Sequence, residues 1–309
     1  MLEAMHMQPI DDEFHFRGRT SEWWEVETLW FAFDVPERGL DGIVYLVTRV
    51  GMGHTTLFVN IFDQSGHEPW RMRYARSLWG LPIPESLRTF EMPEVGLRFE
   101  TLKPMKSYKI DYAHANLKLD LTFDGLNEPI LFPGKYGGVH IDQCVRAHGT
   151  IELDGETIPV DCFQMRDRSW GSMRSDLEDR EGGYTYAVAS ADSAFNIISS
   201  REPGGHYQMR TGFLIRDGKV GRLKSGTREV LERGEHGQPV RVLVTGVDEF
   251  ERSFIAESET VSFAILQVPG NILGIACLSR WQFDGQECFG EEQEATNTIA
   301  YSRILRDAC

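Results

Sequence analysis

Two strand-forming runs flank the pair Asp154-Gly155, and this pairing constrains the fold more than any other short stretch of the chain. An Asp-Gly pair between such runs is a strong signal for a β-hairpin with a two-residue loop. With that loop, Ile151 lies opposite Ile158 on an apolar face. A slip of one residue would place Ile151 opposite Thr157 and mix the two faces, so the sequence favours the first register.

The same register, continued away from the turn, places Asp142 opposite Asp167 and His140 opposite Ser169. Directly opposed residues have Cβ atoms about 5 Å apart. Like charges at that separation are unfavourable, so the pair needs an explanation. One explanation is a shared proton, with one carboxyl kept neutral as an acid. The alternative is that both aspartates lie on the surface and pair with arginines of the hairpin. The register alone leaves both interpretations open.

Short runs of strand-forming residues recur along the rest of the chain and are separated by turns. Residues 117–123 alternate apolar and polar side chains with period two, which is typical of a half-buried strand. No window has the periodicity of a long amphipathic helix. The sequence therefore predicts an all-β fold made of sandwiches or barrels. The polar stretch SMRSDLEDREGG after Gly171 is the best candidate for a domain boundary, and residues 1–20 read as a polar lead-in.

Charge and composition exclude several classes of partner. The 309 residues carry a formal net charge of −15, which argues against nucleic acid and anionic membrane surfaces. The most apolar window, residues 263–278, is interrupted by Gln267, Pro269 and Asn271, so we expect no membrane span. The five cysteines show no framework spacing, and the start of the chain shows no signal-peptide pattern. Both features favour a cytoplasmic protein.

Sequence motifs for nucleotides, activated serines and zinc are missing: there is no Walker loop, GxGxxG, GxSxG, HExxH or Cys/His spacing. His140, Asp142 and His148 share a strand face. At ~3.3 Å per residue, however, His148 lies roughly 20 Å from Asp142, so we expect no metal and no cofactor. The remaining carboxylates, histidine and aromatic residues suit proton transfer. A buried carboxylic acid can protonate an alkene or an alcohol, and aromatic faces can stabilise the resulting carbocation.

Aromatic residues are concentrated before Gly171, where six of the seven tryptophans lie. Core packing explains most of them. The alternative is an aromatic-lined cavity for an apolar ligand, which barrels of this kind often enclose. Tyr136, Trp170 and Tyr184 lie near the aspartates in sequence, although packing is the simpler explanation for any single one.

The segments HIDQ at 140–143 and RDRSWG at 166–171 resemble motifs of the carotenoid hydratases (hydroxyneurosporene synthases) and their AttH-like relatives. The opening SEWWEVETLWFAF resembles the first strands of that family, whereas the closing FGEEQEATNTIAYSR departs from its ending. The resemblance implies two lipocalin-like β-barrel (calycin) domains packed together, with a pocket near their junction. Residues 1–175 would form the N-terminal barrel, which carries both motifs, and residues 176–309 the C-terminal barrel.

The resemblance also implies a function: a cofactor-independent hydratase or dehydratase, a lyase acting on a hydrophobic isoprenoid, steroid or similar small molecule. The expected catalytic residues are Asp167, Asp142 and His140. The expected substrate-binding residues are Trp170 and Arg168, which the motifs carry over, and the aromatic residues Tyr136, Tyr184 and Trp24, which the resemblance does not carry over. Arg168 stands where relatives have a histidine, so the role of that histidine does not carry over. A cyclase or isomerase of a hydrophobic natural product, and a non-catalytic lipid-binding protein, are the alternatives, because fold alone does not decide function. Homodimer formation also stays open.

Overall fold

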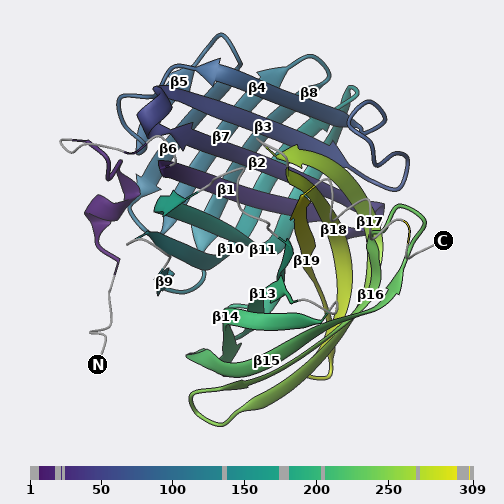
Figure 1. The fold of residues 1–309 in the computed structure, drawn as a ribbon. Coiled ribbons are helices and arrows are strands. Elements are labelled where there is room, and N and C mark those ends of the chain that lie inside the picture. The colour runs from purple at the N-terminus through teal and green to yellow at the C-terminus, as the bar shows by residue number, and fades with distance from the viewer. Residues whose placement is uncertain are drawn as a thin grey trace. The chain divides into compact units, whose positions relative to one another are not determined.

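The structure is a computed structural model that describes residues 7–17, 22, 25–133, 138–173, 181–202, 206–268, 272–297 and 306. Strands make up nearly all of the described secondary structure (Figure 1), so the all-β prediction is confirmed. The short 3-10 segments are η1 (Pro9–Asp12), η2 (Pro36–Arg38) and η3 (Val50–Met52). Two compact units are present. The first contains Met1–Val35, Gly42–Ile61 and Arg73–Arg174, and the second contains Pro36–Asp41, Phe62–Met72 and Ser175–Cys309.

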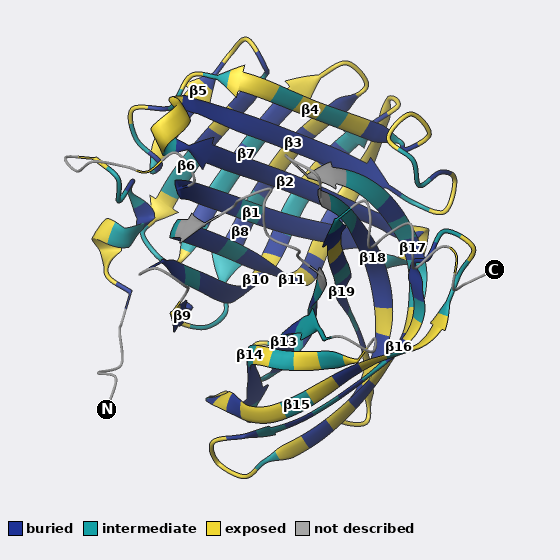
Figure 2. Ribbon diagram, in the orientation of Figure 1, coloured by how far each residue is buried: buried dark blue, intermediate teal, exposed yellow. Residues whose placement is uncertain are grey.

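The first unit is built on one 11-stranded sheet with the order β4-β3-β2-β1-β11-β10-β8-β7-β6-β5, in which β9 pairs with β10. The strands are β1 (Glu25–Val35), β2 (Leu40–Arg49), β3 (His54–Phe62), β4 (Tyr74–Leu81), β5 (Thr89–Met92), β6 (Leu97–Lys103), β7 (Ser107–His114), β8 (Leu117–Gly125), β9 (Ile130–Pro133), β10 (Val139–Leu153) and β11 (Glu156–Met173). The sheet is open between β4 and β5 in the described part of the chain. β1, β2 and β3 are buried along almost their whole length (Figure 2), so side chains on both faces of these strands are covered.

The second unit is a closed eight-stranded barrel that runs in sequence order from β12 to β19. Its strands are β12 (Glu181–Ser190), β13 (Ser193–Arg201), β14 (Tyr207–Arg216), β15 (Lys219–Arg233), β16 (Pro239–Asp248), β17 (Ser253–Val268), β18 (Ile272–Phe283) and β19 (Gln286–Asn297). A barrel of this size has an interior that side chains can fill or that can hold one small ligand. β15 carries exposed residues along most of its length (Figure 2), as expected for a strand with one face in solvent.

The central hairpin has the register that the sequence predicts, with Leu153 opposite Glu156 and the pairing continuing to Val139 opposite Trp170. Asp154 and Gly155 have φ values of 55° and 82°. Positive φ at both central positions is what a type I′ turn requires, and this turn matches the twist of the flanking strands. β11 also pairs with β1, while β10 pairs with β8 and β9, so the hairpin lies inside the sheet.

The prediction of a polar lead-in over residues 1–20 is wrong for the part of it that the structure describes. Met7, Asp12 and Phe14 are buried. The carboxylate of Glu13 accepts a hydrogen bond from the backbone N–H of Leu87 at 2.7 Å. The polar side chains of this segment find partners far away in sequence, so local polarity gave no sign of their burial.

We expect Gly155→Ala to destabilise the protein by about 1 kcal/mol, because only glycine adopts this left-handed conformation without strain. An added Cβ would have no heavy atom within 4 Å, so the loss comes from the backbone alone. Urea unfolding of the variant and the wild type measures the difference. An unchanged free energy of unfolding would contradict the type I′ turn.

Candidate active site

Four adjacent strands of the first unit, β1, β11, β10 and β9, place a set of polar and aromatic residues on one face of the sheet. Directly opposed residues of antiparallel strands share a face, so the pairing defines the rows of this set. The first row is Trp30, Asp167, Asp142 and Ile130, and the second row is Thr28, Ser169, His140 and Phe132. We call this set of eight residues the acid face.

The two aspartates are direct neighbours across the hairpin, as the register requires. Asp142 has no exposed surface, whereas Asp167 is partly exposed. The two carboxyl groups therefore differ in what they can touch. Asp167 keeps some exposed surface, whereas Asp142 can act only through neighbouring side chains.

His140 connects the buried aspartate to Ser169. Its Nε2 lies 2.9 Å from Asp142 Oδ1, and its Nδ1 lies 2.9 Å from Ser169 Oγ. The side chain is 20% exposed, so the ring has both a buried partner and an accessible surface. A buried carboxylate at one ring nitrogen orients the imidazole and stabilises its protonated form. The Ser169 hydroxyl can donate to Nδ1 of a neutral ring and accept from Nδ1–H of a protonated ring.

Arg168 and Trp170 lie on the opposite face of β11, because successive residues of a strand point to opposite faces. Arg168 donates from Nη2 to Glu13 O at 2.6 Å and to Glu27 Oε2 at 3.1 Å. Burial lowers the pKa of its guanidinium, and the charge of Glu27 opposes that effect. Trp170 stacks on His15 with ring centroids 4.1 Å apart. The structure therefore separates these two predicted substrate-binding residues from the aspartate pair.

The other predicted substrate-binding residues lie in the second unit or outside the described residues. Tyr184 is on β12 of the second unit, where its ring meets Tyr186 edge to face at 5.6 Å. Tyr136 and Trp24 fall outside the described residues. Within the first unit, the structure brings together His140, Asp142 and Asp167, which are the predicted catalytic residues.

Sequence analysis missed the two aromatic residues of the acid face. Trp30 is directly opposite Asp167, is partly exposed, and meets Tyr45 edge to face at 5.0 Å. Phe132 is directly opposite His140, with ring centroids 6.2 Å apart. Strand alternation could have shown which residues share a face with Trp30 on β1. It could not have shown that β1 lies beside β11.

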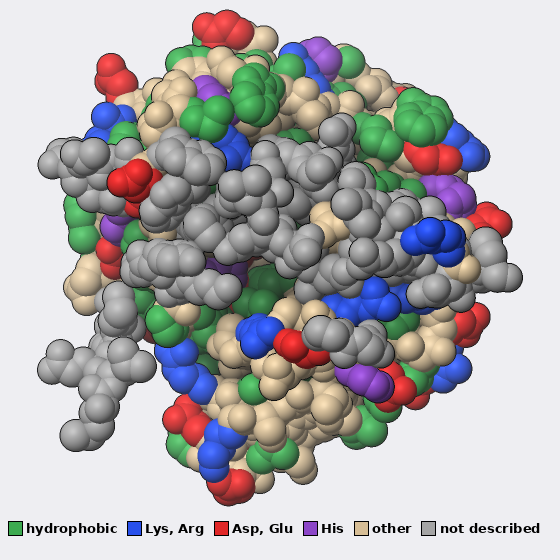
Figure 3. Space-filling model, in the orientation of Figure 1, with side chains coloured by type: hydrophobic (Ala, Val, Ile, Leu, Met, Phe, Trp, Pro, Cys, Tyr) green, Lys and Arg blue, Asp and Glu red, His purple; other side chains and the backbone are tan. Residues whose placement is uncertain are grey.

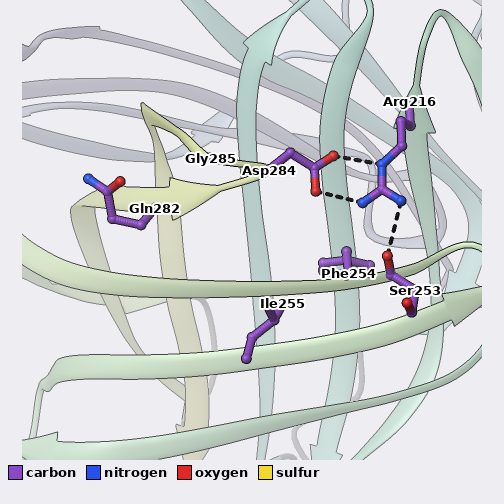
Figure 4. A pocket seen from close by; sticks show the side chains of 7 residues that line it. All are labelled: Arg216, Ser253, Phe254, Ile255, Gln282, Asp284 and Gly285. Atoms are coloured by element: carbon purple, nitrogen blue, oxygen red, sulfur yellow. Dashed lines mark hydrogen bonds and ion pairs between the residues drawn. The ribbon is translucent and has the colours of Figure 1, made fainter.

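A separate shallow pocket of about 430 Å³ lies in the second unit (Figure 4). Its lining is Arg216, Ser253, Phe254, Ile255, Gln282, Asp284 and Gly285. Arg216 pairs with Asp284 through two hydrogen bonds and donates a third to Ser253 O. These contacts neutralise the charges of the pocket, and its lining includes none of the predicted site residues.

The described residues contain neither a candidate metal site nor a candidate membrane-spanning helix. Among the described residues, no group of three or more His, Cys, Asp or Glu side chains is placed to hold a metal ion. No helix in the described part of the chain is long and apolar enough to cross a membrane. On the face drawn in Figure 3, acidic and basic side chains are scattered among apolar ones outside the grey atoms.

The fold has known structural relatives. An AttH-like protein from Nitrosomonas europaea shares 13% sequence identity with this chain at a TM-score of 0.65, with 96% of this chain and 98% of that chain covered. Kievitone hydratase from Nectria haematococca shares 9% identity at a TM-score of 0.59, with 89% of each chain covered. These similarities confirm the prediction of a fold with two lipocalin-like units.

Sequence comparison gives the family. No curated protein matches the chain by sequence. The model of a family described as "Domain of unknown function (DUF7064)" matches residues 8–298. Because this match covers nearly the whole length, the chain belongs to the DUF7064 family.

Proposed function

We propose that the protein is a cofactor-independent hydratase or dehydratase that acts on a hydrophobic molecule such as an isoprenoid or a steroid. The observation that carries the proposal is the arrangement of two aspartates on the acid face. Partly exposed Asp167 lies beside fully buried Asp142, whose Oδ1 holds His140 at 2.9 Å. The fold of kievitone hydratase, a hydratase by name, supports a reaction of this class.

Asp167 is the proposed proton donor. In the hydration direction its carboxyl proton adds to one carbon of a C=C bond and leaves a carbocation on the other carbon. A water molecule then bonds to that carbon, and its surplus proton returns to the Asp167 carboxylate, directly or through His140. Dehydration is the reverse: Asp167 protonates the hydroxyl group, water leaves, and the neighbouring C–H gives up its proton to the Asp167 carboxylate.

Asp142 and His140 are proposed to support the proton transfer by Asp167. Asp142 lies directly opposite Asp167 and holds the His140 ring through Oδ1. Asp142 is fully buried, so it cannot contact a substrate and acts through position and charge. His140 can pass a proton between Asp142 at Nε2 and the Ser169 hydroxyl at Nδ1.

Trp30 is proposed to stabilise the carbocation, since aromatic faces attract positive charge. It lies directly opposite Asp167 and is partly exposed, whereas Phe132, opposite His140, is buried and is not assigned a contact with the substrate. Tyr136 and Trp24 stand as expected substrate contacts within the proposal, whereas Tyr184 lies on β12 of the second unit and is not assigned to the acid face. Arg168 and Trp170 lie on the opposite face of the sheet. We therefore do not propose that they contact the part of the substrate that reacts.

Isotope labelling tests the proposal. The purified protein, without added cofactor, is incubated in H₂¹⁸O with a panel of isoprenoid and steroid alkenes and alcohols. We expect one ¹⁸O atom in the hydrated product of the wild type and none with Asp167→Asn, which keeps the side-chain shape. Ring closure or double-bond migration without ¹⁸O would favour the cyclase or isomerase alternative. Tight binding without turnover would favour lipid binding.

A further inference from the structure

The face of β10 and β11 opposite the acid face carries two fully buried arginines, Arg166 and Arg168, and we call it the arginine face. Arg166 donates from Nε to Gln143 Oε1 at 2.6 Å, and its guanidinium lies 4.1 Å from the centre of the Tyr108 ring. Its Nη1 and Nη2 have no hydrogen-bond partner among the described residues, and the same holds for Nε and Nη1 of Arg168. A buried donor without a partner costs about 1–3 kcal/mol, and arginine stays charged. Four buried nitrogens of the arginine face therefore lack an acceptor among the described residues.

The N-terminal segment 7–17 supplies a carboxylate beside Arg166, whereas Arg168 already pairs with Glu27 of β1 at 3.1 Å. Asp12 is buried and accepts hydrogen bonds from the Tyr108 hydroxyl at 3.0 Å and from the backbone N–H of Met105. Its Oδ1 is 4.0 Å from Arg166 Nη2, so the ion pair is longer than a hydrogen bond. The carboxylate of Asp12 thus lies where an anion can bind, but it forms no hydrogen bond with Nη1 or Nη2 of Arg166.

The same segment also covers an apolar strip on the arginine face. Met7 packs in a cluster with Leu131, Val139, Ile141 and Trp170. The apolar side chain of Met7 and the carboxylate of Asp12 therefore both lie on the arginine face. Together they have the chemistry of a small amphiphile: Met7 covers apolar surface, and Asp12 meets Tyr108 and Arg166.

We propose that the arginine face binds an apolar molecule bearing a carboxylate, which takes the places of Asp12 and Met7 as segment 7–17 moves away. A ligand carboxylate can accept two parallel hydrogen bonds from Nη1 and Nη2 of Arg166, the geometry that makes arginine a specific carboxylate receptor. The ligand's apolar part lies along the strip that Met7 covers. The site lies on the opposite face of the hairpin from the aspartate pair, and the proposal is independent of the proposed reaction.

Calorimetric titration of the full chain at pH 7 with decanoate and with decan-1-ol tests the proposal. We expect decanoate to bind and decan-1-ol to bind much more weakly. Arg166→Met should weaken decanoate binding by roughly tenfold or more, because the paired hydrogen bonds are lost. Asp12→Asn should tighten it by about tenfold, because the competing carboxylate is gone. Arg146→Met is the matched control, since Arg146 is on the same hairpin, is exposed and pairs with Asp161.

The titrations distinguish decanoate binding at the arginine face from binding at the acid face. They also distinguish a binding role of the arginines from a purely structural one. Equal binding of decanoate and decan-1-ol, or no binding of either, overturns the proposal. Decanoate binding that Asp12→Asn leaves unchanged also overturns it, and this variant stays informative if Arg166→Met fails to fold. Asp167→Asn should bind decanoate as the wild type does. A loss of decanoate binding in that variant would place the ligand on the acid face instead.

Discussion

Replacing Asp167 with asparagine is expected to lower kcat by about 10²–10⁴-fold, the range that a positioned general acid contributes. Asparagine keeps the shape of the side chain but has no proton that it can give to an alkene or a hydroxyl group. It also keeps a neutral side chain opposite Asp142, as the proton-carrying Asp167 does, so we expect the thermal midpoint to stay level. Steady-state kinetics on a substrate found by isotope labelling, together with a thermal melt, measure both effects.

Asp142→Asn should lower kcat less than Asp167→Asn does, because Asp142 is buried and acts through His140 and through its charge. Its effect should include a shift of the pH–rate profile, which a purely structural residue would not cause. Asp161→Asn is the matched control, since this aspartate is also on β11 but is exposed and paired with Arg146. Wild-type kcat/KM in Asp167→Asn would show that Asp167 is not the proton donor.

The part of the site that the sequence predicts correctly depends on local information. An Asp-Gly pair fixes the loop, and period-two alternation then sets the partner of every residue as far as Asp142 and Asp167. The same alternation already places Arg168 on the other face from Asp167. The family resemblance placed Asp167 and Arg168 in one motif, RDRSWG. In the structure, the side chains of this motif lie alternately on the two faces of β11.

The rest depends on contacts between residues that are remote in sequence. Trp30 joins the acid face only because β1 pairs with β11, and Asp12 meets Tyr108 only because segment 7–17 lies on the sheet. The order of strands in a sheet and the path of a polar segment leave no pattern among neighbouring residues of the sequence, so neither could be predicted from it. The ion cluster inside the second unit is a further example, since Arg228 meets two glutamates of the last strand.

Arg228 holds this cluster together. It is fully buried and donates from Nε to Glu292 Oε1 at 2.9 Å and from Nη2 to Glu294 Oε1 at 2.8 Å. Glycine at position 183 makes room for it, since a Cβ there would lie 2.7 Å from Arg228 Nε. Burial raises the pKa of Glu292, and the charge of Arg228 opposes that effect. Burial also acts to raise the pKa of Glu294, but Arg228 and Arg233 outweigh it and lower the pKa to about 2.

Arg228→Met is therefore expected to destabilise the protein by about 3–5 kcal/mol at pH 7, because it leaves buried Glu292 without a cation and leaves Glu294 with Arg233 alone. Adding Glu292→Gln should recover part of this loss. Arg241→Met, which breaks an exposed ion pair with Glu257, should cost less than about 1 kcal/mol and serves as the control. Urea unfolding of the four proteins at pH 7 gives the free energies of unfolding.

The pH dependence distinguishes a charge effect from a packing effect. In the wild type, the folded pKa of Glu294, about 2, lies below its usual value of 4.5. This carboxylate therefore contributes stability above pH 4.5, and the contribution falls as the pH drops toward 2. In Arg228→Met the buried carboxylates have lost their main cation and bind protons more readily, so acid favours the folded state of the variant. The difference in unfolding free energy between wild type and variant should then shrink from pH 7 to pH 4. A difference that stays constant over this range would show that Arg228 stabilises the barrel by filling space and not by its charge.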